Sequence, residues 1–244
     1  PDYIRTVAEA MKIATVDKDN HVGDPRFIDI PVELLMSKEY AKEMADKIKS
    51  GEKTHVPRLQ KGEDQKETTH VCAIDNAGNC VSMTHSLGMP SGVVTEGLGF
   101  VYNGCMGVFD PRPGKTGSLA PGKSRFTSMA PSMIFKDGKP MLLIGAPGGT
   151  YIAMGVVQGI LNVLDFGMDA EKAVAAPRFS ATSDIIEIVN RIPHFVQEEL
   201  EAHGYAFRRY PLGFHFAGVH AIRITEDGVD GGADPGRDGM ALAV

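Results

Sequence analysis

The sequence predicts an α+β fold, a four-layer αββα sandwich in which two sheets lie face to face between helices. One observation is that strand pairs alternate with helical stretches along the chain. Another is that the strands of the first predicted hairpin are apolar on both faces, with Val71 and Val81 on one side and Cys72 and Ile74 on the other. Strands of that kind belong to sheets that are covered on both sides.

The first fifty residues are predicted to be largely helical. Apolar residues recur at helical spacing from Tyr3 to Ala14, and a polar-faced helix is predicted over Lys38–Lys49, ending before Gly51. From Glu52 to Glu67 the chain is polar and without periodicity, which is typical of a mobile linker.

A hairpin is predicted over Thr68–Leu87. Its turn, Asp75 to Gly78, fits a type I turn closed by a glycine in the left-handed conformation. This turn sets a register that places Ile74 opposite Cys80, Cys72 opposite Ser82, and Thr68 opposite Ser86. Opposed side chains lie about 4.5–5.5 Å apart between Cβ atoms, so the two hydroxyls of the last pair can interact.

The remaining elements follow from shorter patterns. A second hairpin pairs two strands across a Lys-Asp-Gly-Lys turn, and an apolar helix follows it. The predicted strands are Phe100–Asn103, Ser132–Phe135, Met141–Ile144, Ala206–Arg209 and Gly218–Ile224, and the predicted helices are Tyr151–Leu164, Ala170–Ala175 and His194–His203.

Composition excludes several classes of partner. The chain has 244 residues, enough for a sizeable core, and a formal charge of −6 with scattered basic residues. We therefore expect neither nucleic acid nor an acidic membrane as a partner. No apolar run is long enough to span a membrane, and the N-terminus lacks a basic-then-apolar signal, so the compartment is open between cytoplasm and periplasm or exterior. Three cysteines make no disulfide framework, and we expect no metal and no cofactor.

The pair Thr68-Thr69 stands where the polar linker meets a strand. A hydroxyl nucleophile needs a base, and a residue that becomes a chain terminus can use its own α-amine. Thr68 is therefore a candidate nucleophile and Ser86 a candidate for orienting it. The alternative is that both are ordinary strand residues.

A glycine-rich turn, Gly145 to Thr150, follows a strand and opens a helix. Backbone N–H groups in such a turn can hold an oxyanion or a phosphate, which makes Gly148 and Gly149 candidates for an oxyanion hole. The alternative is a tight turn that needs glycine only for its geometry.

A second glycine motif, Gly117 to Ser124, matches the phosphate-binding P-loop pattern. That loop requires a buried strand before it and a helix after it. The preceding Asp110 to Lys115 contains two prolines, and Pro131 follows soon, so we expect no nucleotide site here.

These blocks together resemble the γ-glutamyltransferase family of N-terminal-nucleophile hydrolases. The resemblance covers nearly the whole chain and follows the order of that family's small subunit. It rests on Thr68-Thr69-His70 with Asp75 to Asn79, on Ser128 to Pro131, on Pro147-Gly148-Gly149, and on Ala233-Asp234-Pro235 with Arg237-Asp238-Gly239. Residues 1–67, with Asp2-Tyr3-Ile4 and Gly23-Asp24-Pro25, resemble the end of the large subunit, most of which is missing here.

The resemblance implies a precursor that cuts itself between Glu67 and Thr68, giving a large-subunit tail with linker over 1–67 and a catalytic small subunit over 68–244. It implies that Thr68 attacks an amide carbonyl, that Gly148 and Gly149 hold the oxyanion, and that the acyl group passes to water or an amine. Ser86 stands where the family carries a second threonine.

The substrate pocket departs from the family pattern. Gly88 replaces an asparagine, and Cys105 and Val108 stand in a block that supplies amide and acidic contacts to the substrate α-amine. Thr127 and Ser128 keep the two hydroxyls that meet the α-carboxylate. A buried ammonium without an anionic partner is costly, which favours an acyl group other than γ-glutamyl, such as an oxamate-type or glutaryl-type amide.

Three classes of function remain from the sequence. The first is an amide-cleaving hydrolase or acyltransferase whose substrate is a small-molecule amide or peptide. In that class, the missing large-subunit segment is a partner of this chain. The second is an inactive family member, and the third is a nucleotide-binding module that rests on the P-loop pattern alone. The oligomeric state is left open.

Overall fold

The N-terminal segment is helical, as predicted. The computed structural model describes residues 1–57 and 67–243. Helix α1 spans Asp2–His21, α2 Val32–Leu35 and α3 Lys38–Lys49, the last with the predicted bounds. Ser37 caps α3 by accepting a hydrogen bond from the Tyr40 amide, which satisfies a backbone donor that the helix itself leaves unpaired.

The predicted hairpin and its register are confirmed. Strand β1 spans Glu67–Ile74 and β2 Cys80–Gly88, and they pair antiparallel with Thr68 opposite Ser86, Cys72 opposite Ser82 and Ile74 opposite Cys80. Gly78 adopts a φ of +83°, and its amide donates to the Asp75 carbonyl at 3.0 Å. The pairing becomes irregular between Glu67 and Thr68.

The main sheet has the order β11-β10-β6-β5. The second predicted hairpin is confirmed as β5 (Ser132–Lys136) and β6 (Lys139–Gly145). Strand β10 spans His220–Thr225, so it begins two residues later than predicted, because the Gly218 amide donates to the Pro147 carbonyl instead of to a strand. Strand β11 (Gly228–Ala233) was missed, since its glycines depress the strand signal.

A three-stranded sheet, β7-β8-β9, forms a second core with α1 and α6 (His194–Ala202). Strand β9 (Ala206–Tyr210) was predicted, whereas β8 (Ile185–Val189) and the two-residue β7 (Phe179–Ser180) were not. Strand β4 (Val101–Asn103) was predicted, but its partner β3 (Pro90–Val94), which carries Pro and Gly, was missed.

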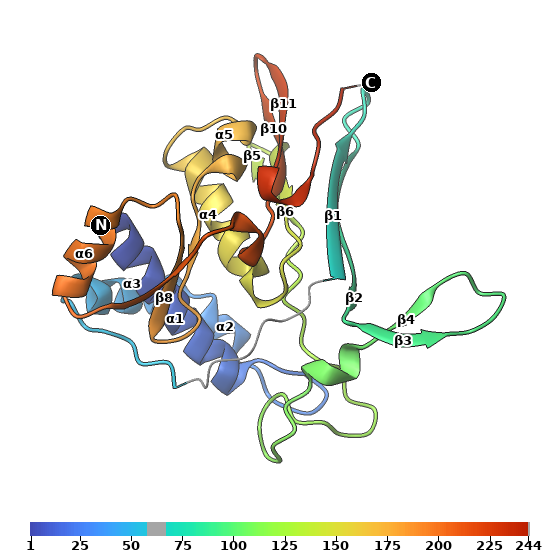
Figure 1. The fold of residues 1–244 in the computed structure, drawn as a ribbon, viewed down its shortest axis with the longest axis horizontal. Coiled ribbons are helices and arrows are strands. Elements are labelled where there is room, and N and C mark those ends of the chain that lie inside the picture. The colour runs from blue at the N-terminus through green and yellow to red at the C-terminus, as the bar shows by residue number, and fades with distance from the viewer. Residues whose placement is uncertain (58–66, 244) are drawn as a thin grey trace.

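The main sheet that contains β6 is the middle one of three layers, between the β1–β2 hairpin and helices α4 and α5 (Figure 1). The hairpin β1–β2 packs on one face of the main sheet, with the Ser82 hydroxyl donating to the Ile144 carbonyl at 3.2 Å. Helices α4 (Ile152–Leu164) and α5 (Ala170–Ala175) pack against the sheet, and they bury Ile144, Val219 and Ala221 in the core. The chain is thus a mixed α+β fold, as predicted.

One expectation about the hairpin is wrong for this chain. Its two faces differ, because His70 is 7% exposed whereas Val71, Val81 and Met83 on the other face are 44%, 48% and 51% exposed. The apolar outer face is therefore uncovered here.

The expected linker is also partly corrected. Residues 58–66 lie outside the described part of the chain, but the preceding residues are anchored. The Val56 side chain is 2% exposed and its amide donates to Asp184 at 2.7 Å, while the Thr54 amide donates to Glu9 at 2.8 Å. Since Ile4, Ala8 and Met11 of α1 share a core with β8, the segments before and after residue 67 fold as one unit.

Candidate functional site

Thr68 and Ser86 form a direct hydroxyl pair. Their Oγ1 and Oγ atoms lie 2.8 Å apart, and the Gly88 amide donates to the Ser86 Oγ atom at 2.9 Å. Because that amide fills one acceptor position of Ser86, the serine proton can be directed at the Thr68 oxygen. The arrangement leaves the Thr68 proton for a separate base.

Gly88 and Cys105 lie next to this pair. Gly88 ends β2 with a φ of +71°, and a Cβ atom there would lie 3.0 Å from the Cys105 Sγ atom. Cys105 begins a 3-10 helix, η1 (Cys105–Val108), and its thiol donates to the Leu87 carbonyl at 3.5 Å. The predicted substrate residues Gly88 and Cys105 are thus brought together, and Val108 ends the same short helix.

Gly148 and Gly149 form the turn into α4 through the 3-10 helix η2 (Gly149–Tyr151). Gly148 has a φ of +144°, and a Cβ atom there would lie 2.6 Å from the Cα atom of Ala217. The Ser128 hydroxyl donates to the Gly149 carbonyl at 2.7 Å, while the Thr127 hydroxyl accepts from the Met129 amide at 3.2 Å. Ser128 is therefore joined to the glycine turn, whereas Thr127 bonds within its own loop.

The Thr68 group and the glycine turn are related through the packing of the hairpin on β6. A Cβ atom at Gly145 would lie 2.2 Å from the His70 ring, so His70 covers that glycine. Along the inner face of the hairpin, Ser82 meets Ile144 and His70 meets Gly145. Beyond His70 on the same face of the hairpin comes the pair Thr68 and Ser86. Beyond Gly145, the chain leaves β6 and reaches Gly148. The hydroxyl pair and the glycine turn therefore lie toward the same end of the sheet.

His70 was missed as a site residue, although its position two residues after Thr68 places it on the same face of the strand. Its ring bonds Thr84 Oγ1 at 2.9 Å and Cys72 Sγ at 3.2 Å. Burial, together with the nearby His220, lowers the pKa of His70 to about 4, and burial raises the pKa of Cys72 to about 11. Both are therefore neutral near pH 7, and Cys72 is not a thiolate nucleophile.

A second polar cluster was also missed from the sequence, and it adjoins the glycine turn through Tyr151, the last residue of η2. The Tyr151 hydroxyl donates to Glu187 at 2.7 Å and lies 2.9 Å from His215 Nε2, and Tyr210 donates to Glu187 at 2.9 Å. Burial opposes ionisation of Glu187, but hydrogen bonds from His215, Tyr151 and Tyr210 outweigh it and lower its pKa. These residues come from distant parts of the sequence and have no motif that could reveal them.

The P-loop pattern is not a phosphate site. Residues 117–124 lie in an irregular loop that neither follows a strand nor opens a helix. The Ser124 amide, one of the donors that would face a phosphate, donates to the Asp24 carboxylate at 2.7 Å, and Lys123 donates to the Thr116 carbonyl at 2.7 Å. Among the described residues, no group of three His, Cys, Asp or Glu side chains is placed to hold a metal ion.

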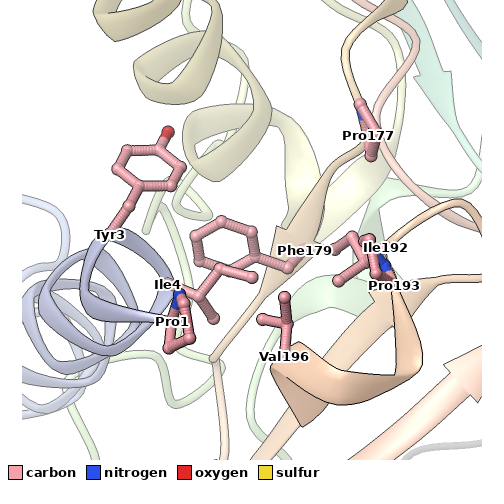
Figure 2. A pocket seen from close by; sticks show the side chains of 8 residues that line it. All are labelled: Pro1, Tyr3, Ile4, Pro177, Phe179, Ile192, Pro193 and Val196. Carbon is pink, nitrogen blue, oxygen red and sulfur yellow. The ribbon is translucent and has the colours of Figure 1, made fainter.

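Two cavities lie elsewhere in the molecule. One of about 260 Å³ is lined by Pro1, Tyr3, Ile4, Pro177, Phe179, Ile192, Pro193 and Val196 (Figure 2). The other, of about 530 Å³, lies between α1 and α3. Neither cavity contains a predicted site residue. In the described part of the chain, no helix is both long and apolar enough for a transmembrane span.

The chain thus combines a mixed α+β fold with a hydroxyl pair at the start of a strand and a glycine turn at the end of the facing sheet. The sequence model of the gamma-glutamyltranspeptidase family matches residues 1–244, and the chain belongs to that family.

The three cysteines, Cys72, Cys80 and Cys105, are free thiols, as expected.

The relatives include both acylases and glutathione hydrolases. Over 100% of its own length, this chain is 37% identical to the acylase ACY 1 proenzyme of Pseudomonas sp. (strain V22). Over 99% of its own length, it is 32% identical to the glutathione hydrolase proenzyme of Pseudomonas aeruginosa. It spans 44% and 46% of the length of those two proteins.

Two solved structures show the same fold. Cephalosporin acylase from Bacillus halodurans matches 98% of this chain with 44% of its own, at a TM-score of 0.84 and 27% identity. Gamma-glutamyltranspeptidase from Pseudomonas nitroreducens, complexed with L-DON, matches 72% of this chain with 99% of its own, at a TM-score of 0.65 and 33% identity.

Proposed function

We propose that this protein is an amide-cleaving hydrolase or acyltransferase whose nucleophile is Thr68, exposed by self-processing. The observation that carries the proposal is the 2.8 Å contact between the Thr68 and Ser86 hydroxyls at the start of β1. Ser86 orients the Thr68 oxygen, and the α-amine of a terminal Thr68 takes the proton.

Processing uses the same hydroxyl. The Thr68 Oγ1 atom attacks the Glu67 carbonyl carbon, the C–N bond breaks, and the acyl group moves from nitrogen to oxygen. Water then hydrolyses that ester, which leaves a Glu67 carboxylate and a free Thr68 amine. The irregular pairing at the Glu67–Thr68 peptide supports this step, because bulges commonly lie beside active sites and lift a peptide out of the ladder.

The comparisons support the position of the cut. A chain of the Pseudomonas nitroreducens structure matches 72% of this one, about 176 of 244 residues, along 99% of its own length. Residues 68–244 number 177, which fits a separate chain that begins at Thr68. We propose that 1–67 and 68–244 are the large-subunit tail and the small subunit. They share a core and stay together after the cut.

In turnover, the Thr68 hydroxyl adds to the substrate carbonyl, and the amide N–H groups at Gly148 and Gly149 hold the oxyanion. The amine leaves with the proton that the Thr68 α-amine had taken, and an acyl ester on Thr68 remains. Water or an acceptor amine then attacks the ester, releasing the acid or a new amide and restoring the hydroxyl.

The acyl group is proposed to carry a carboxylate and to lack an α-amine. Gly88, Cys105 and Val108 offer no carboxylate for an ammonium. Thr127 offers a hydroxyl proton for a carboxylate, whereas the Ser128 proton is given to the Gly149 carbonyl. A glutaryl-type or oxamate-type amide fits that set better than a γ-glutamyl one. The similarity to an acylase proenzyme also supports an acyl group other than γ-glutamyl.

The remainder of the full-length polypeptide is proposed to complete the site and the sandwich. Val71, Val81 and Met83 present an exposed apolar face, which fits a covering layer contributed by the part of the relatives that this chain does not span. That part would add the outer helical layer and an arginine for the substrate carboxylate.

The test uses the full-length polypeptide and its Thr68→Ala variant. We expect the parent to appear as two bands on a denaturing gel and to release aniline from a glutaryl anilide. We expect the variant to stay as one band and to release none. A parent that is neither cut nor active would instead be an inactive family member.

A further inference from the structure

The loop between η1 and Ser128 is tied to the N-terminal segment by a buried carboxylate. Asp24, which is 5% exposed, accepts hydrogen bonds from the Ser124 amide at 2.7 Å and from the Arg26 amide at 3.0 Å. The Arg26 guanidinium also donates to both Asp24 oxygens, at 3.2 Å and 2.8 Å. Arg26 then reaches the Gly122 carbonyl at 2.9 Å and the Ser124 hydroxyl at 3.1 Å.

Further contacts join the same two segments. The Thr116 hydroxyl donates to the Asp19 carbonyl at 3.1 Å, and a Cβ atom at Gly23 would lie 2.9 Å from the Thr116 carbonyl oxygen. The Lys123 ammonium lies 5.7 Å from the centre of the Phe27 ring. The loop is therefore seated on residues 19–27 at several points along its length.

These contacts continue to the proposed site. Ser124 is four residues before Ser128, whose hydroxyl donates to the Gly149 carbonyl at 2.7 Å. Four residues span at most about 14 Å, so the two anchors leave the intervening Thr127 little freedom. The path runs from Asp24 through Ser124 to Ser128 and the glycine turn.

We propose that Asp24 and Arg26 are positioning residues that set acyl-group selectivity, by holding segment 122–128 so that the Thr127 hydroxyl meets a substrate carboxylate while Ser128 stays bonded to the glycine turn. This inference rests on the proposed function. If the chain is cut before Thr68, Asp24 lies on one product and Ser124 on the other. The fragment before the cut then shapes the pocket of the fragment after it.

Charge makes this contact specific. Hydrogen bonds to an ionised carboxylate are about twice as strong as neutral ones, and the two-point contact with a guanidinium fixes direction as well. The hydrogen bonds from Arg26 and then from Ser124 hold the pKa of Asp24 well below its ordinary value. An asparagine at this position keeps the size but loses the charge and one acceptor oxygen.

The experiment compares Asp24→Asn and Arg26→Ala with the parent in the full-length polypeptide. Asp17→Asn is the matched control, because Asp17 accepts the Tyr40 hydroxyl at 3.0 Å and 2.9 Å and this contact joins only the N-terminal helices. For each protein, the cut is scored on a denaturing gel. Steady-state kinetics are then measured with a glutaryl anilide and with an uncharged butanoyl anilide.

We expect both variants to be cut normally and to raise KM for the glutaryl anilide by about tenfold, with kcat within about threefold. The butanoyl anilide has no carboxylate to place, so its kcat/KM should barely change, and the ratio between the substrates should fall. The control should keep the parent ratio. Formate added to Asp24→Ala should restore part of the ratio by replacing the missing anion.

The outcomes separate the two claims. A cut and active parent with an unchanged ratio in Asp24→Asn and Arg26→Ala overturns the positioning role and leaves the proposed function standing. Equal losses for both anilides show a merely structural role and overturn it as well. A parent that is neither cut nor active overturns both. If Asp24→Asn does not fold, Arg26→Ala carries the test, since that side chain is 65% exposed.

Discussion

The Thr68 and Ser86 hydroxyls lie 2.8 Å apart across the first hairpin, although 18 residues separate them in the sequence. The contact depends on the register that the Asp75 to Gly78 turn imposes, because a shift of one residue would send one of the two side chains to the opposite face.

Ser86→Ala removes the hydroxyl that orients Thr68. One hydrogen bond is worth about 0.5–1.5 kcal/mol, so we expect turnover to slow by about 2-fold to 13-fold with the fold unchanged. The measurement is kcat with a glutaryl anilide, beside a thermal melt. Ser82→Ala is the control, because Ser82 lies on the same face of β2 but bonds Ile144 instead. Equal rates in Ser86→Ala and the parent would show that the pair has no role in turnover.

Gly148→Ala should displace the glycine turn. The new Cβ atom would lie 2.6 Å from the Ala217 Cα atom, and the φ of +144° disfavours any side chain. Loss of one oxyanion donor costs about 10²–10³ in kcat, so we expect a loss of at least about 100-fold.

The control for that variant is Gly138→Ala. Gly138 also has a positive φ, +75°, but a Cβ atom there would have no atom within 4 Å beyond its own chain neighbours. It should lose some stability and keep its rate. A Gly148→Ala enzyme with the parent rate contradicts the assignment of the oxyanion hole.

His70 predicts a loss of stability in acid. Its pKa in the folded protein is about 4, because burial and then His220 disfavour the cation, whereas the ordinary value is 6.5. As pH falls from about 6.5 to about 4, the unfolded chain takes up a proton that the folded chain does not, so the free energy of unfolding decreases. Below about pH 4 this contribution levels off.

The check is denaturant unfolding of the parent and His70→Gln at about pH 7 and about pH 5. The variant should show a smaller loss between the two, with a residual slope from His220, whose pKa is also lowered by burial, then Arg178 and Arg237. The same pH slope in both proteins would exclude His70 as the source.

Substrate choice is the prediction that departs most from the family. A γ-glutamyl anilide should be turned over more slowly than a glutaryl one, since Gly88, Cys105 and Val108 offer no anion for an α-ammonium. The assay compares kcat/KM for the two on processed protein. If the γ-glutamyl compound is faster by about tenfold, equivalent to about 1.4 kcal/mol, another residue supplies the anion.

The elements with local signals were predictable from the sequence. The hairpin register followed from one turn, and the bounds predicted for α3 and α5 match the structure, α3 as a polar-faced helix that ends before Gly51. Strands β3, β8 and β11 were missed because proline, glycine or a short apolar run hides the period-two pattern. These three segments become strands because they pair with neighbouring strands in the folded chain, and not because of a local sequence pattern.

The candidate site likewise contains residues that the sequence reveals and contacts that only the folded chain reveals. Thr68, Gly148 and Gly149 stand in motifs, and Ser86 follows from the predicted hairpin register, so all four could be named from the sequence. Asp24 and Ser124 are 100 residues apart, and Tyr151 and His215 are 64 apart, so only the folded chain shows that they bond. Side-chain pairs that close long loops leave no local pattern.

The N-terminal residue of the active material tests the central claim most directly. The full-length polypeptide, purified as active enzyme, is separated on a denaturing gel, and each band is read by mass spectrometry. The account predicts a fragment that begins with Thr68 and a second that ends with Glu67, with Thr68→Ser cut more slowly and Thr68→Ala uncut, because no other residue provides both the hydroxyl and the new α-amine. Full activity in an uncut chain, or in Thr68→Ala, would contradict it.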